Sequence, residues 1–113
     1  MVKYLISFPS AAMVVPEADL DAVAEAAHAV IREAKAAGVY VFGGGIDEDV
    51  DAVLVSGDGT VSEETYRRTR ELDGGFSVLD LPSREAALEW AARIAAACRC
   101  PQELRKFQDD PES

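Results

Sequence analysis

The 113-residue sequence lacks any long apolar run and any segment typical of export. No uninterrupted stretch approaches the roughly 18 apolar residues that a membrane-spanning helix needs. The N-terminal MVKYLISFPS is too short and too strand-like for a signal peptide. We therefore predict a cytoplasmic protein without a membrane partner.

Positive charge is also scarce. The chain has 11 Lys and Arg residues against 21 Asp and Glu residues, which gives a net charge of −10. A field of this sign repels the phosphate backbone of nucleic acids and the surface of anionic membranes. The charge balance thus predicts no nucleic-acid partner and again no membrane partner.

Metal-ligating and redox-active side chains are few, because the chain has only Cys98, Cys100 and His28. A disulfide between residues two positions apart would be strained, and structural zinc sites usually need four ligands. We interpret both thiols as small hydrophobic side chains in a reducing compartment. We predict no metal and no cofactor.

Two further motifs fall short of a ligand site. Asp47, Asp49 and Asp51 fit the first three ligand positions of a calcium loop, but Ala52 replaces the glycine of the sixth position. Gly43–Gly45 lacks the spacing and the following helix of a phosphate-binding loop. We interpret the first motif as an acidic solvated loop, and the second as a close backbone approach or a strand bulge.

What the sequence does contain is an ordinary globular composition. The apolar share is 49%, and the length suits one domain. We predict a single domain over residues 1–108 and an acidic C-terminal tail over residues 109–113. Alanine supplies much of the apolar content and adds little core volume, so we expect a partner chain to supply further buried surface.

Residue periodicity predicts the order strand, helix, strands, helix, strand. Apolar runs bounded by turn residues indicate the strands, and an apolar stripe that ends at Gly38 indicates the first helix. A second helix follows Pro82, with Ser83 as its N-cap. The expected elements are strands at Val2–Phe8, Val39–Phe42, Ala52–Ser56, Phe76–Leu81 and Gln102–Phe107, a helix at Glu17–Ala37, and a hairpin turn at Gly57–Gly59. This order predicts an α+β fold, the ferredoxin-like βαββαβ sandwich.

Four segments in order along the chain carry a resemblance: KYLIS, AAHAVIREAKAAGV, GTV…TRELDGGF and LPSREAALEWAARIAAA. Together they resemble the YCII-related family, in particular the branch that carries an Asp-Gly-Pro-Phe (DGPF) tetrad. The resemblance implies a homodimer of the dimeric α/β barrel type, in which two ferredoxin-like sheets face each other. It also implies a small-molecule ligand, because one branch of the family dechlorinates an aromatic diol.

The sequence departs from this family at the tetrad. When Thr60-Val61 and Gly74-Gly75-Phe76 are aligned, the tetrad positions hold Glu63, Glu64, Thr65 and Tyr66, whereas Thr69-Arg70-Glu71 match the family's Thr-Lys-Glu run. Glu64 and Thr65 cannot impose the turn that glycine and proline would fix. We expect the loop to keep its frame and to differ from its relatives at the tip.

His28 is the candidate acid/base, since the resemblance implies an active-site histidine and histidine exchanges protons near neutral pH. A helical wheel places it about 110° from the centre of the apolar stripe, on the flank of its helix near Glu25 and Arg32. No acidic residue directly precedes Gly38, where some relatives carry one. Glu63 is therefore the remaining candidate for a carboxylate that orients the histidine.

Two functions stay open at this point. The first is a small-molecule enzyme, lyase-like or dehydrochlorinase-like, with His28 and Glu63 as catalytic residues and with Tyr4, Tyr66 and Arg70 contacting the substrate. The alternative is a non-catalytic ligand-binding or regulatory interaction domain on the same fold. The altered tetrad and the missing acid favour the alternative, whereas His28 favours the enzyme.

Overall fold

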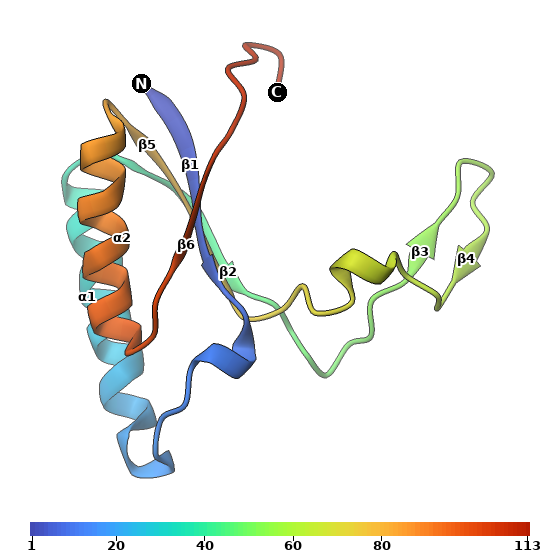
Figure 1. Ribbon diagram of the computed structural model, residues 1–113, viewed down its shortest axis with the longest axis horizontal. Helices are drawn as coiled ribbons and strands as arrows, with labels where there is room; N and C mark the ends of the chain where they lie inside the picture. The colour runs from blue at the N-terminus through green and yellow to red at the C-terminus, as the bar shows by residue number, and fades with distance from the viewer.

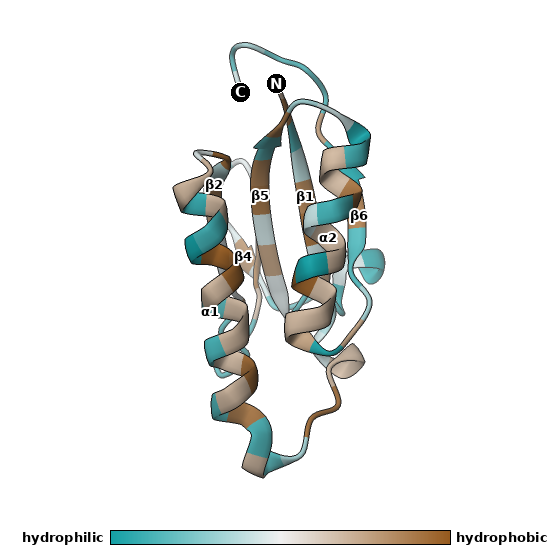
Figure 2. Cartoon of the chain, turned by 90° about the vertical axis from the view of Figure 1, so that its left-hand side faces the viewer, coloured by the Kyte–Doolittle hydropathy of each residue, from teal (hydrophilic) through white to brown (hydrophobic).

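A computed structural model describes all residues, 1–113, as an antiparallel sheet with two helices on one face (Figures 1 and 2). Apolar alternation in the sheet strands places one row of side chains under the helices. The main elements are β1 Val2–Phe8, α1 Leu20–Ala36, β2 Tyr40–Gly45, β5 Gly75–Leu81, α2 Arg84–Cys98 and β6 Glu103–Lys106. The strand order β2-β5-β1-β6, antiparallel throughout, confirms the predicted ferredoxin-like α+β fold.

The predicted end of α1 and the predicted start of α2 are both confirmed. Gly38 has φ +74°, and the amide of Val39 donates to the carbonyl of Ala34 at 3.1 Å, which closes α1. The hydroxyl of Ser83 accepts a hydrogen bond from the amide of Ala86 at 3.1 Å and caps α2. At the start of α1 the prediction is less accurate, because Glu17–Asp19 form a short 3₁₀ turn, η2, before the α-helix begins.

The core lies between α2, the end of α1 and the two central strands. Alanines on the helices let the backbone approach the sheet, so bulky side chains come mainly from β1 and β5. The fully packed cluster consists of Tyr4, Ile6, Ala34, Leu79, Leu81, Ala87 and Ala91. Because this cluster sits toward one end of α1, the N-terminal half of α1 is left less tightly packed on the sheet.

Strand β2 is longer than the sequence predicts. It continues through Gly45 and pairs with β5 as far as Gly75, with a bulge between Tyr40 and Phe42. A Cβ at Gly43 would lie 2.8 Å from the hydroxyl of Tyr40, so glycine allows this close approach. The predicted role of the glycine run as a bulge or close backbone approach therefore holds, but the run belongs to the strand.

Residues 46–74 form an arm that projects from the sheet on the side opposite the helices (Figure 1). The arm carries the predicted hairpin: β3 Leu54–Val55 pairs with β4 Val61–Ser62, and Gly59 has φ +89° in the turn. A 3₁₀ turn, η3, covers Arg67–Thr69. This hairpin is separate from the main sheet.

No helix of the structure has both the length and the apolar character needed to cross a membrane.

Candidate functional site

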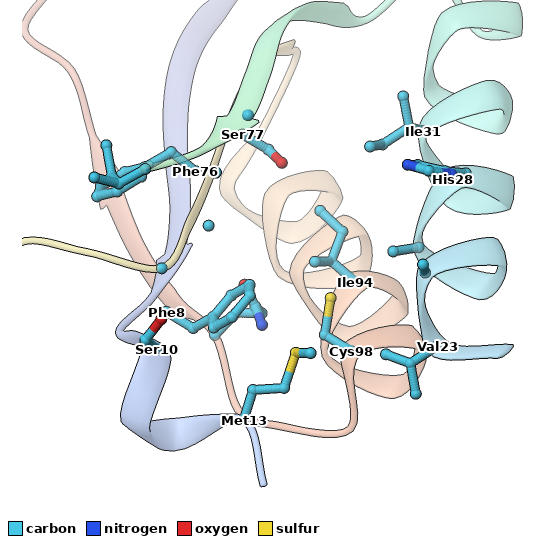
Figure 3. Close-up of a pocket in the computed structure, with 18 of the residues that line it drawn as sticks. Phe8, Ser10, Met13, Val23, His28, Ile31, Phe76, Ser77, Ile94 and Cys98 are labelled. Carbon is cyan, nitrogen blue, oxygen red and sulfur yellow. The ribbon is translucent and has the colours of Figure 1, made fainter. Parts of the chain in front are cut away.

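A cleft of about 770 Å³ lies between α1 and the sheet. It exists because the N-terminal half of α1 lies apart from the strands, beyond the end of the packed core. Apolar side chains from both layers form most of its wall, as Figure 3 shows for Phe8, Met13, Val23, Ile31 and Ile94. The cleft therefore offers a largely apolar environment that remains open to solvent.

Two polar groups face each other across this cleft. The imidazole of His28 projects from α1, and the hydroxyl of Ser77 projects from β5 toward the same space (Figure 3). The imidazole is exposed and makes no hydrogen bond to another residue. Its predicted neighbours Glu25 and Arg32 form an ion pair with each other. Both ring nitrogens of His28 are thus free to bond a ligand.

The edge of the cleft is fixed by a small hydrogen-bond network. The hydroxyl of Ser10, just after β1, donates to Glu48 Oε2 at 2.8 Å. The amide of Ser10 donates to Asp73 Oδ1 at 2.9 Å. These two bonds join three segments that are distant in sequence: the turn after β1, the loop after β2 and the residue before Gly74. Ser10 and Glu48 both line the cleft.

The other sequence-predicted site residues lie elsewhere. Tyr4 is 4% exposed and belongs to the packed core. Glu63, Tyr66 and Arg70 are exposed on the arm, and none of them lines the cleft. The structure therefore brings His28 together with Ser77 and Glu48, and leaves Glu63 without contact to His28 within one chain.

The two thiols do not have the character of nucleophiles. Burial raises the pKa of Cys98 above its ordinary value, and the neighbouring Cys100 raises it further. Burial also raises the pKa of Cys100. Both are free thiols. Since the thiolate is the reactive form, a raised pKa lowers the reactivity of each near neutral pH. Cys98 in the cleft wall thus contributes packing.

No group of three or more His, Cys, Asp or Glu side chains is arranged to hold a metal ion. The acidic loop residues instead accept local backbone hydrogen bonds: Asp47 from the amide of Asp49 at 3.0 Å, and Asp58 from the amide of Thr60 at 2.9 Å. The side chain of Thr60, and to a smaller extent its backbone amide, lower the pKa of Asp58 below its ordinary value. Such turns are the usual role of Asp in connecting loops.

Sequence reasoning missed Ser77, Ser10, Glu48 and Asp21 as cleft residues. One signal for Ser77 was present: in FSVLDL it shares its strand face with Leu79 and Leu81, so a polar side chain points toward the helix layer. The pairing of Ser10 with Glu48 joins residues 38 positions apart in loops. Local patterns carry no information on such a pair.

The comparisons agree with the fold. The family description "YCII-related domain" matches residues 3–99, from β1 to the end of α2. Among proteins with curated descriptions, none matches the chain. The matched region includes His28, Ser77 and every other residue of the cleft except Gln102. The chain belongs to the YCII-related domain family.

Proposed function

We propose that this chain binds a small organic molecule in the cleft between α1 and the sheet, and that His28 exchanges a proton with it. The observation that carries the proposal is the pair of unbonded polar groups, His28 and Ser77, on opposite walls of an otherwise largely apolar cavity. Ligand sites commonly combine apolar walls with a few convergent polar groups.

In the enzymatic form of this proposal, the reaction is lyase-like or dehydrochlorinase-like. His28 takes a proton from the bound molecule, the electrons released form a new double bond, and the C–Cl bond breaks so that chloride leaves. The hydroxyl of Ser77 hydrogen-bonds an oxygen of the same molecule. Histidine suits this role because it accepts protons near neutral pH. Hydrogen chloride is the eliminated product, so no oxidant or cofactor is required.

The second candidate is a ligand-binding or regulatory domain without catalysis. It is favoured by one observation: no carboxylate hydrogen-bonds the imidazole of His28. A histidine that works as a general base is usually oriented by such a group. In this form His28 contributes a hydrogen bond to the ligand and nothing more.

Chloride release from chlorohydroquinone separates the two candidates. For the enzyme, we expect wild-type protein to release chloride faster than buffer, and His28→Gln to reduce the rate at least about 100-fold, since glutamine keeps a hydrogen bond but cannot exchange a proton. Equal release by both proteins would contradict the role of His28. If wild type releases no chloride, the binding candidate is preferred.

We also propose that the chain forms a homodimer through the uncovered face of the sheet. Both helices lie on one face (Figure 2), and the opposite face exposes a row in which Phe42 pairs with Val78 and Val78 with Leu5. Phe42 is 67% exposed. Nearby, Asp80 Oδ1 is buried without a hydrogen-bond partner. A second sheet would cover the apolar row, and it could supply a donor to Asp80.

The arm projects on the side where this second copy would lie (Figure 1). In the dimer, Glu63, Tyr66 and Arg70 of the arm are therefore proposed to contact the neighbouring copy or a ligand held there. Such a contact would let these three residues contribute to a site even though they lie away from the cleft of their own chain.

Light scattering tests the dimer. At tens of micromolar we expect twice the mass of the 12.1 kDa chain. Phe42→Asp should give monomers, because a carboxylate in the centre of a buried interface is strongly unfavourable. Leu88→Asp, an equivalent change at an exposed position on α2, should leave the dimer intact. A monomeric wild type, or an equal effect of both variants, would contradict the proposal.

A further inference from the structure

The cleft carries formal charge of one sign only. Asp21, in the first turn of α1, and Glu48, on the loop after β2, line it, whereas no Lys or Arg does. The four ion pairs of the structure involve Asp19, Glu25, Glu33 and Glu103. The negative charges of Asp21 and Glu48 are therefore not compensated by a protein cation.

One carboxylate oxygen of Glu48 is hydrogen-bonded and the other is not. Its Oε2 accepts the hydrogen bond from Ser10 at 2.8 Å, and Ser10 is in turn fixed through its amide by Asp73. No protein donor hydrogen-bonds the other carboxylate oxygen, Oε1. A carboxylate with one hydrogen-bonded oxygen can still accept a charge-assisted hydrogen bond from a cationic donor at its free oxygen.

Apolar surface lies beside these charges. Phe8, from the end of β1, and Met13 lie on the side of Ser10, the hydrogen-bond partner of Glu48, whereas Ile31 and Ile94 lie toward His28 (Figure 3). Aromatic faces attract ammonium groups, and aliphatic side chains bury the rest of an organic ligand. An aromatic or aliphatic body with one positive end fits this combination of walls and charge.

We infer that, among small organic ligands with an apolar body, this cleft prefers an amine bound as its ammonium form. The inference rests on the proposed function, because it assigns a ligand class to the same cleft. The ammonium group hydrogen-bonds Glu48 and lies in the field of Asp21, while the apolar body reaches toward His28 and Ile94. The net charge of −10 adds a general attraction for cations and repels anions.

Three probes of similar size test the inference: 2-phenylethylamine, 2-phenylethanol and 3-phenylpropionate. Their affinities are measured by NMR titration at about pH 8, where free imidazole is neutral. We expect the amine to bind about tenfold more tightly than the alcohol, and the carboxylate to bind more weakly than the alcohol. Higher salt should weaken the binding of the amine but not that of the alcohol or the carboxylate.

Variants of the two cleft carboxylates test whether the preference for the amine arises in the cleft. Glu48→Gln should lower the amine's affinity about threefold, and Asp21→Asn with Glu48→Gln about tenfold, while the affinity for 2-phenylethanol stays unchanged. Asp51→Asn is the matched control, because it removes one exposed charge from the same loop without lining the cleft. It should leave the amine's affinity unchanged.

The outcomes separate this inference from the proposed function. If 2-phenylethanol binds in the cleft and the amine binds no better, or if Asp51→Asn weakens the amine as much as Glu48→Gln does, the ligand class is wrong and the ligand site stands. If none of the three probes binds, the amine inference is overturned as well. Preferential amine binding that is lost in the double variant supports it.

Discussion

Replacing Gly74 by alanine is expected to destabilise the protein by at least about 3 kcal/mol, a drop of about 10 °C or more in melting temperature. Gly74 has φ +82°, a region that costs other residues about 1–2 kcal/mol. A Cβ there would also lie 2.0 Å from the carbonyl oxygen of Phe8 and 2.8 Å from the amide nitrogen of Ser10. Both atoms are backbone, so the end of β1 would have to move.

Gly38→Ala is the matched control for this prediction. Gly38 has φ +74°, but a Cβ there would meet nothing within 4 Å. Gly38→Ala should lower the free energy of unfolding by about 1 kcal/mol, the cost of placing alanine at a positive φ. Thermal or urea unfolding of both variants gives the comparison. Equal losses would show that the packing of Gly74 against β1 does not matter, and would contradict the account of this junction.

The shift of β1 expected in Gly74→Ala would also change the cleft, because Phe8, Ser10 and Gly74 all line it. The carbonyl of Gly74 also accepts the amide of Ile46 at 2.9 Å, next to Glu48. The Gly74-Gly75 pair therefore has a structural role: it lets three segments meet at the edge of the cleft. A Cβ at Gly75 would lie 2.6 Å from the ring of Phe8.

Replacing Ala24 by tryptophan is expected to reduce binding of 2-phenylethanol at least about tenfold, without loss of the fold. Ala24 is exposed on α1 and lines the cleft, so an indole at this position occupies space that the ligand needs. The position has little packing to disturb, and large side chains at exposed helix sites usually change stability by less than about 0.5 kcal/mol. Ligand-observed NMR measures the affinity, and circular dichroism measures the fold.

Ala26→Trp controls for the substitution itself. Ala26 is on the same helix and is also exposed, but it does not line the cleft. Its binding should equal that of wild type. If Ala24→Trp binds as well as wild type, or if both variants lose binding equally, the ligand lies outside the cleft and the proposed function fails.

Local signals predicted the fold well. Gly38 and Ser83 mark helix ends by backbone conformation and side-chain capping, which depend on a few adjacent residues. The sheet order followed from the sequence of elements, because few topologies suit that order. The end of β2 was missed, since a glycine run normally signals a turn, and here pairing with β5 outweighs that tendency.

The site was predicted only in part. His28 stands out as the single histidine and was predicted to lie on the flank of α1, and the structure places it in the wall of the cleft. The resemblance to the family indicated Glu63 and Tyr66 as site residues, but both lie on the arm and do not line the cleft of the same chain (Figure 1). Glu48 and Ser10 meet only through tertiary structure, so no local pattern could identify them.

The most direct test of the ligand site is the NMR signal of the His28 imidazole during titration with 2-phenylethanol. The chain has one histidine and one tryptophan, so both side chains give single, assignable signals. Trp90 packs against the core and does not line the cleft. We expect a saturable shift of the His28 signal, with the Trp90 indole signal unchanged. A silent His28 signal while the probe binds and shifts other resonances would contradict the proposed ligand site.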